Sequence, residues 1–362
     1  MAAGCRSAGQ RGKPTKGFEE CPASPCLAHL SSCMRKTLLW LLILSLLTAR
    51  AGAQDEQGFS SQVNLVRVPT LVRDAGGLAV LGLHAQDFII EDDGAPQAVH
   101  LDEAAESEPV SLMIAVQCGH HAKREAGRIE GLASMLDPVL TDPDNEAAVL
   151  FFDSKLNLAR DFTSNSEQIE NDLKTLPPGD GGAAILDAIA YSARLLAKRD
   201  SGRKLVLLLI SETRDHGSKF TKTDTALTLV DANNVSVYTL PFSPYISQQL
   251  DTARGANKDE WSPVIDILEK IQDVHQAMRK NIPKTLAELT GGEYELFATR
   301  NGFEDNLIGF ANHLHARYEL SFEPKNPHAG LHQIRVRLRN PGKDQTVLYR
   351  RTYLVLSAET LN

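Results

Sequence analysis

Two short apolar runs, each followed at once by polar residues, set the strongest constraint on how this chain can fold. The first occupies residues 111–116 and precedes the polar tail 117–121, and the second occupies residues 205–210 and precedes 211–216. Uninterrupted apolar runs of this length are typical of strands buried on both faces of a parallel sheet. Ligands bind to such open sheets just beyond the carboxyl ends of the strands. The sequence therefore predicts a site where the two polar tails meet.

Strand patterns and helix patterns alternate around these runs between residues 108 and 317. The predicted strands cover residues 111–116, 147–152, 205–210, 235–240 and 293–297. The predicted helices, which share an amphipathic spacing, cover residues 129–140, 164–176, 184–196, 225–232, 283–289 and 303–317. A capping box, Ser164-x-x-Glu167, marks the start of the second helix. Repeated units of this kind predict an α/β fold with a doubly wound, mostly parallel, Rossmann-like sheet.

Segments with β patterns flank the α/β region. The first spans residues 62–105 and the second residues 318–358, and turns that contain Gly or Pro divide both of them. We hypothesise that the two segments pack together as one small sandwich, into which residues 108–317 are inserted. The acidic turn Glu91-Asp92-Asp93-Gly94 is interpreted as a hairpin rather than a Ca²⁺ site. Residues 257–280 form a charged insertion, interpreted as a surface helix, with a partner-binding element as the alternative.

The N-terminus carries the pattern of a secretory signal peptide. Residues 34–53 combine a positively charged start, the apolar core 38–47 and the cleavage-type sequence Ala51-Gly52-Ala53. We expect cleavage after Ala53 and a secreted, periplasmic or cell-envelope location. The apolar core is too short to span a bilayer stably, so the mature chain has no predicted transmembrane segment. Residues 1–33 are interpreted as an extension that results from a mis-assigned start codon.

Charge and cysteine content narrow the classes of function. Without residues 1–53 the chain has 31 Lys and Arg against 44 Asp and Glu, a net charge of −13 instead of −8. This charge, together with the lack of a basic cluster in the sequence, argues against nucleic-acid binding. Four of the five cysteines precede residue 54, which leaves Cys118 alone. The exported chain therefore has no disulfide framework, and a hydrophobic core must stabilise it.

Several short motifs accompany the strand–helix order. They are Val72-Arg-Asp74, Leu83-x-x-x-Asp87-Phe88, Glu91-Asp-x-Gly94-x-Pro-Gln97, Phe151-Phe-Asp153, Asp161-Phe-Thr163, Gly181-Gly-x-Ala-x-x-Asp187-Ala188, Asp215-x-Gly-Ser218 and Tyr318-x-Leu. With these motifs, residues 108–317 resemble a von Willebrand factor type A (VWA) domain. The whole mature chain is similar to the secreted VWFA-related proteins of Acidobacteria, in which β segments flank the VWA unit.

VWA domains usually bind Mg²⁺ at a metal-ion-dependent adhesion site (MIDAS), whose hydroxyl and carboxylate ligands suit a hard cation. The resemblance maps the five ligand positions onto Gln117, Gly119, His121, Ala183 and Glu212. Every position departs from the family's pattern, and only Glu212 keeps a negative charge. The resemblance therefore implies a degenerate MIDAS that holds neither Mg²⁺ nor another resident cofactor. The residues around this site at the carboxyl ends of the strands, here called the rim, would contact a protein partner directly.

A second interpretation of the same rim remains open. If the two central strands are adjacent, His120, His121, Glu212, Asp215 and His216 lie close together. Imidazole and carboxylate groups suit Zn²⁺ or a similar transition metal. The simpler interpretation is a set of histidines on solvent-facing loops.

Other chemistry-bearing residues receive structural interpretations. Cys118 could be a thiol nucleophile, but a lone buried cysteine is the commoner case. Asp187 is interpreted as a structural residue near a helix start, and Asp153 and Asp215 as turn or surface acids. The sequence contains no Gly-x-Ser-x-Gly, no phosphate-binding Gly-rich loop with Lys and no His-Glu-x-x-His. We therefore predict no enzymatic activity.

The favoured function is that of a secreted VWA-domain protein that mediates protein–protein interaction or adhesion without a metal. One alternative is a transition-metal or enzymatic rim formed by His120, His121, Glu212 and His216. The other is a scaffold component of a cell-envelope assembly. The sequence identifies neither the partner nor the oligomeric state.

Overall fold

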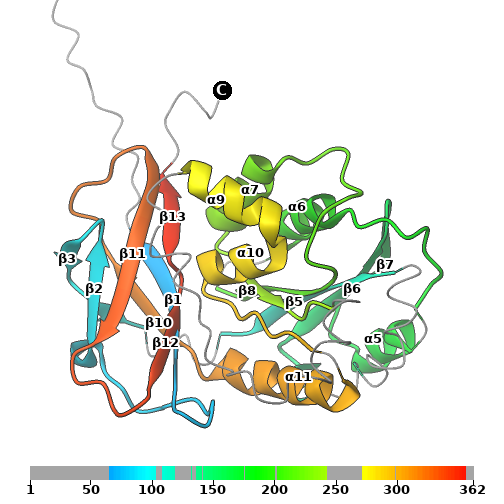
Figure 1. Ribbon diagram of the computed structural model, residues 1–362. Helices are drawn as coiled ribbons and strands as arrows, with labels where there is room; N and C mark the ends of the chain where they lie inside the picture. The colour runs from blue at the N-terminus through cyan, green and yellow to red at the C-terminus, as the bar shows by residue number, and fades with distance from the viewer. Residues whose placement is uncertain are drawn as a thin grey trace, which may run out of the picture. The chain divides into compact units, whose positions relative to one another are not determined.

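The two apolar runs form β5 (Val110–Gln117) and β8 (Lys204–Ile210), which lie side by side in a five-stranded sheet (Figure 1). The structure is a computed structural model, and it describes residues 65–102, 108–118, 132, 136–140, 142–174, 176–199, 202–242, 271–297 and 299–355. The strand order is β7–β6–β5–β8–β9, and β6 (Glu146–Phe152), β5, β8 and β9 (Ser236–Thr239) are parallel. The chain builds one side of the sheet and then crosses to the other side of β5. The carboxyl ends of β5 and β8 therefore form the switch point at which such sheets bind ligands.

Residues of β5 alternate between two hydrophobic cores, one on each face of the sheet. Leu112 and Ile114 belong to the first core, and Met113 and Ala115 to the second. The first core includes residues of α4 (Asp137–Leu140), α5 (Ser166–Leu173) and α11 (Arg300–His315). The second includes residues of α6 (Ile185–Leu196), α7 (Thr223–Ala232), α9 (Ile271–Lys280) and α10 (Ile282–Thr290). Helices cover both faces in Figure 1, so the predicted doubly wound α/β fold is confirmed.

The edges of this sheet differ from the sequence prediction. β7 (Leu156–Thr163), which was not predicted, pairs antiparallel with β6. An edge strand has one neighbour and half-buried side chains, so it lacks the apolar run that marks the central strands. Residues 293–297 do not form the predicted strand, because two isolated parallel bridges, Thr239 to Tyr294 and Phe242 to Phe297, are their only described β pairing.

The N-cap of α5 lies one residue later than the sequence predicts. The side chain of Asn165, not of Ser164, caps α5 by accepting a hydrogen bond of 3.1 Å from the backbone N–H of Gln168. The predicted capping box is therefore wrong by one residue. Of the predicted helix 129–140, the described part includes α4 at its carboxyl end.

Strands from both β segments mix in two four-stranded sheets. One sheet has the order β12–β1–β10–β4, with β12 (Thr346–Tyr349), β1 (Val66–Arg73), β10 (Tyr318–Phe322) and β4 (His100–Leu101). The other has the order β13–β11–β2–β3, with β13 (Thr352–Val355), β11 (Gly330–Leu338), β2 (Phe88–Asp92) and β3 (Ala95–Gln97), and a 3₁₀ turn, Ala85–Asp87, precedes β2. Val68, Leu320, Ile90 and Val336 share one hydrophobic core between the sheets. This is the arrangement that the single-sandwich hypothesis requires, and the acidic turn is a β2–β3 hairpin.

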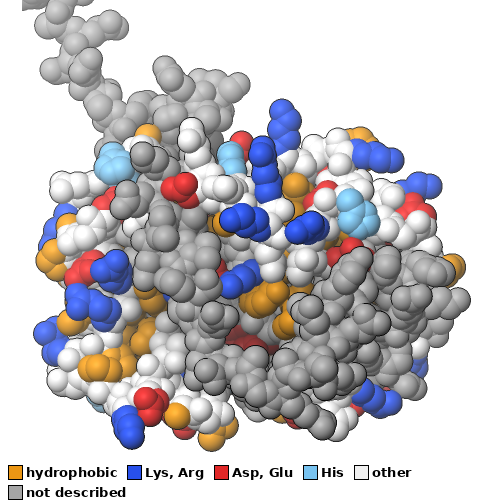
Figure 2. Space-filling model, in the orientation of Figure 1, with side chains coloured by type: hydrophobic (Ala, Val, Ile, Leu, Met, Phe, Trp, Pro, Cys, Tyr) orange, Lys and Arg blue, Asp and Glu red, His pale blue; other side chains and the backbone are white. Residues whose placement is uncertain are grey.

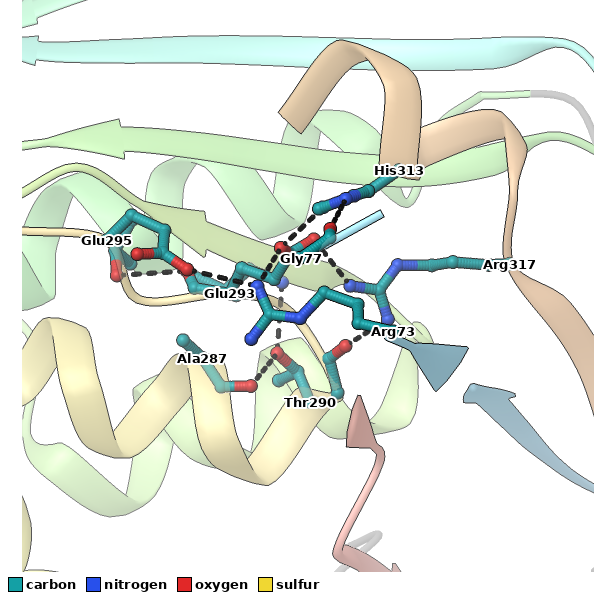
Figure 3. A network of polar contacts seen from close by, with 11 residues as sticks. Arg73, Gly77, Ala287, Thr290, Glu293, Glu295, His313 and Arg317 are labelled. Atoms are coloured by element: carbon teal, nitrogen blue, oxygen red, sulfur yellow. Dashed lines mark hydrogen bonds and ion pairs between the residues drawn. The ribbon is translucent and has the colours of Figure 1, made fainter. Parts of the chain in front are cut away.

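A buried ion-pair network centred on Glu293 joins the sandwich to the α/β region (Figure 3). Arg317 Nη2 lies 3.0 Å from Glu293 Oε1, and His313 Nδ1 lies 2.8 Å from Oε2. Arg73 of β1 adds a longer contact of 3.5 Å to Oε2. The Nε2 atom of His313 also lies 3.0 Å from the carbonyl oxygen of Gly77. All these residues belong to one compact unit, Ser61–Asn362.

Helix α9, which is the described part of the insertion 257–280, packs on the α/β region. Val274 and Met278 are buried in the second core, whereas Arg279 and Lys280 are exposed. Figure 2 shows Lys and Arg side chains gathered over α7 and α9. The helix thus has the charged outer surface that the sequence indicates. Its role in binding a partner stays a prediction.

Two sequence predictions concern the N-terminal segments. The extension 1–33 and the signal peptide 34–53 lie outside the described residues. No helix within the part of the chain that the structure describes is long and apolar enough to cross a membrane.

Candidate functional site

Gln117 closes β5 at the switch point and is 1% exposed. Its side-chain Oε1 accepts a hydrogen bond of 2.8 Å from the backbone N–H of Glu212, which follows β8. Its Nε2 donates to the carbonyl oxygen of Gly182 at 3.3 Å. A neutral amide therefore links three segments at the position that the resemblance assigns to the first metal-binding aspartate.

Ala183 brings the loop before α6 against the loop after β8. It is fully buried, and its carbonyl oxygen accepts hydrogen bonds of 3.1 Å from the N–H groups of both His216 and Gly217. A Cβ atom on Gly217 would lie 2.8 Å from the backbone nitrogen of Ala184, which is closer than real Cβ atoms approach. Residue 217 must therefore be glycine for the two loops to touch.

Glu212 pairs with a histidine on the same loop. Its Oε2 lies 3.1 Å from Nε2 of His216, whose side chain is 46% exposed. Asp215 does not join this pair, because its carboxylate accepts hydrogen bonds from Leu186 N at 2.9 Å and from Ser218 Oγ at 2.5 Å. Asp215 thus has the contacts of a turn acid, and the five-residue metal cluster stays a prediction.

Three further residues of the predicted rim, Gly119, His120 and His121, lie outside the described residues. The described groups at the mapped MIDAS positions fit Mg²⁺ poorly, because this ion needs about six oxygen ligands in octahedral geometry. Gln117 offers one amide oxygen that already accepts an N–H, and Ala183 offers no side-chain oxygen. Glu212 has its Oε2 paired with His216, which leaves only its buried Oε1 without a hydrogen-bond partner among the described residues.

Two carboxylates hold the segment 215–221, here called the rim loop. Asp187 in the first turn of α6 accepts hydrogen bonds from the N–H groups of Lys219 at 2.9 Å, Phe220 at 3.2 Å and Thr221 at 2.7 Å. Asp215 accepts from the N–H of Ser218 at 3.1 Å. With the two bonds to Ala183, every backbone N–H from residue 216 to residue 221 has an acceptor. Asp187 therefore has a structural role, as predicted. The prediction placed that role at the helix start, whereas the hydrogen bonds of the side chain hold the rim loop.

The fixed backbone presents an exposed aromatic ring. Phe220 is 91% exposed, which makes it the most exposed large hydrophobic residue in the described part of the chain. Exposed cationic residues, Arg214, Lys219 and Lys222, flank it in sequence. Sequence reasoning missed Phe220, although a lone aromatic residue within a polar, lysine-containing loop is a visible signal.

Cys118 follows Gln117 and is 4% exposed. Its backbone N–H donates to the carbonyl oxygen of Phe152 at 2.7 Å. Burial raises the pKa of its thiol to about 12. Because the thiolate is the reactive form, this position does not suit a nucleophile.

We expect native Cys118 to resist alkylation by iodoacetamide at pH 8, since its thiol is both buried and protonated. In denaturant the same thiol becomes accessible and reacts. Mass spectrometry of the chain after each treatment measures the modified fraction. Alkylation of the folded protein at the rate of a free thiol would contradict the buried, protonated state.

A cavity of about 430 Å³ lies at the opposite, amino end of the sheet. Its lining includes Lys204 at the start of β8 and Arg67 and Glu319 from the sandwich. Cations of the lining are paired: Arg67 Nη1 lies 3.5 Å from Glu108 Oε1, Arg350 Nη2 lies 2.5 Å from Asp231 Oδ1, and Arg203 Nε donates to Ser111 Oγ at 2.7 Å. We interpret the cavity as a void in a charged interface between segments that are far apart in sequence.

Comparisons with known proteins show distant likenesses. No protein-family model matches the chain, and no curated protein sequence does either. Among solved structures, BatB of Bacteroides thetaiotaomicron is 14% identical with a TM-score of 0.38, over 57% of this chain and 98% of that one. A von Willebrand factor type A protein from Catenulispora acidiphila is 9% identical with a TM-score of 0.42, over 82% and 75%. The pilus adhesin SpaC of Lactobacillus rhamnosus GG is 12% identical with a TM-score of 0.37, over 79% and 42%.

Proposed function

We propose that the chain binds a protein partner at the carboxyl end of its central sheet, through Phe220 and without a bridging metal. The observation that carries this proposal is an almost fully exposed phenylalanine on a loop whose backbone is fixed by Asp187, Asp215 and Ala183. An aromatic side chain buried at an interface gains about 1.5–3 kcal/mol from leaving water. A loop that is already ordered loses little conformational entropy on binding.

The charges beside Phe220 indicate the chemistry of the partner. Lys219 and Lys222 are exposed on either side of it, and Arg214 lies just before the rim loop. Interfaces commonly combine an apolar pocket for an aromatic anchor with a charged rim. The proposed partner surface is therefore an apolar pocket edged by acidic side chains.

Metal independence is the second part of the proposal. In the resemblance, Mg²⁺ would bridge the rim to a carboxylate of the partner. Gln117 instead holds the rim together by hydrogen bonds to Glu212 and Gly182, so the rim keeps its shape without an ion. We expect binding that does not depend on divalent cations.

The test is capture of a partner from an extract of the producing cells, with the full mature chain as bait. The Phe220→Ala bait should retain at least about tenfold less of the partner than the wild type, because loss of about 1.4 kcal/mol corresponds to that factor. EDTA should leave capture by the wild type unchanged. Leu81→Ala is the matched control, since Leu81 is also an exposed hydrophobic residue, at 69%.

Two outcomes would count against the proposal. Equal capture by the Phe220→Ala and wild-type baits would show that Phe220 is not the anchor of the interface. Loss of capture in EDTA would show that binding depends on a metal ion. The metal or enzymatic rim and the envelope scaffold remain the alternative functions.

We also propose export through the segment 34–53. N-terminal sequencing of the exported protein tests this, because the sequence should begin at Gln54.

A further inference from the structure

Two histidines and two aspartates meet in the sandwich, on elements that take no part in the rim. Asp92 ends β2, and Asp93 lies in the turn between β2 and β3. His332 lies on β11, and His328 just before that strand. Because β2 and β11 pair antiparallel, with Asp92 opposite Ile334, the sheet register brings the turn beside the histidines.

The side-chain atoms of this cluster lie close enough to share one ion. His332 Nδ1 is 2.8 Å from Asp93 Oδ2 and 3.4 Å from Asp92 Oδ1. His328 Nε2 is 3.6 Å from Asp93 Oδ2. One ligand atom each from Asp93, His328 and His332 lies within 4.8 Å of the other two.

The Nδ1 atom of His332 has no hydrogen-bond donor beside it among the described residues. Its Nε2 lies 2.8 Å from the carbonyl oxygen of His328, and because a carbonyl only accepts, this nitrogen carries the proton. In a neutral ring, Nδ1 is then an acceptor that faces two carboxylates. The side chain is 1% exposed, and neither Nδ1 nor Asp92 Oδ1 has a hydrogen-bond partner among the described residues. Acceptors that face one another inside a protein need a cation, either a metal ion or a second proton on the ring.

Surrounding contacts orient the ligands as they do in metal sites. Asp93 Oδ1 accepts from the backbone N–H of Gln333 at 2.9 Å, which aims Oδ2 at the histidine. The hydroxyl of Tyr353 donates to Asp92 Oδ2 at 3.0 Å. The ring of His332 stacks with both His328 and Tyr353, with centroids 4.1 and 4.6 Å away. A histidine whose second nitrogen donates to a backbone carbonyl is the usual arrangement for a metal ligand.

We propose that Asp93, His328 and His332 form a binding site for Zn²⁺ or a similar transition-metal ion. Two imidazole nitrogens and one carboxylate oxygen suit Zn²⁺ better than Mg²⁺ or Ca²⁺, which prefer oxygen ligands throughout. A fourth position is left for water or for Asp92. The ion would link the β2–β3 turn to the start of β11, and it would stabilise the sandwich because it binds only the folded arrangement. This site is independent of the partner-binding rim.

The test is isothermal titration of the full mature chain, without a histidine tag, with ZnCl₂ and separately with MgCl₂. We expect one saturable Zn²⁺ site, a higher melting temperature in Zn²⁺ and no such response to Mg²⁺. His328→Ala and Asp93→Asn should each weaken Zn²⁺ binding by at least about tenfold. Both side chains are well exposed, and Asn tolerates the positive φ of 47° at position 93, so both variants should fold.

His216→Ala is the matched control, because it removes an exposed histidine from the rim instead. It should bind Zn²⁺ as the wild type does. The proposal is overturned if the wild type shows no saturable Zn²⁺ binding, in which case a protonated His332 neutralises the carboxylates. It is equally overturned if His328→Ala and Asp93→Asn bind like the wild type, or if His216→Ala alone abolishes binding and places the ion at the rim.

Discussion

Glu293→Gln should lower the free energy of unfolding by about 3–5 kcal/mol at pH 7, because it leaves a buried guanidinium without its counter-charge. Arg317 is 6% exposed, and its guanidinium donates to Glu293 at 3.0 Å and to the carbonyl oxygen of Gly291. Glutamine has nearly the same shape as glutamate, so the loss reports on charge rather than on packing. Urea unfolding followed by circular dichroism measures the difference.

The loss should depend on pH in a defined direction. Burial raises the pKa of Glu293, but the hydrogen bond from His313 and the charges of Arg317 and Arg73 outweigh it and hold the pKa below its ordinary value of 4.5. A carboxylate of this kind stabilises the fold above pH 4.5, and the stabilisation disappears as the pH falls through the lowered pKa. The wild type and Glu293→Gln should therefore converge in stability in strong acid.

Glu295→Gln is the matched control for this network. Glu295 lies 3.3 Å from the same Arg73, but its side chain is 40% exposed. Ion pairs in water contribute about 0–1 kcal/mol, so this variant should lose little stability. Equal losses for the two variants would show that the buried charge at position 293 does not hold the sandwich to the α/β region.

Glu319→Gln should do the opposite and stabilise the protein at alkaline pH. Burial beside the 430 Å³ cavity raises the pKa of Glu319 to about 7, against the charges of Arg67 and Lys204. Between pH 4.5 and about 7 the unfolded chain loses this proton while the folded chain keeps it, so wild-type stability falls as the pH rises. With a discount for partial contact with water, we expect a gain of about 2 kcal/mol for Glu319→Gln at pH 8 and none at pH 4.

Melting temperatures at the two pH values are sufficient to detect this change. Glu323→Gln serves as the control, because Glu323 is exposed just beyond the same strand and its replacement should change stability little at either pH. A Glu319→Gln variant that is no more stable than the wild type at pH 8 would show that the folded protein ionises Glu319 without cost.

Local sequence patterns were sufficient for the central strands of the five-stranded sheet but not for its edges. The apolar runs predicted β5 and β8, because a strand that is buried on both faces needs an apolar residue at every position. β7 was missed, because an edge strand with half-buried side chains leaves no such pattern. The site shows the same division, since the polar tails located the rim, while the backbone of Phe220 is held by Asp187, which precedes it by 33 residues.

By itself the sequence determined the class of fold and the position of the switch point with its polar residues. Only the tertiary structure decided what those residues do. Gln117 bonds to a backbone group 95 residues away, and Asp93 bonds to Gln333, 240 residues away. Periodicity reports which face of an element is buried, but the partner of a buried polar group is set by how distant elements pack.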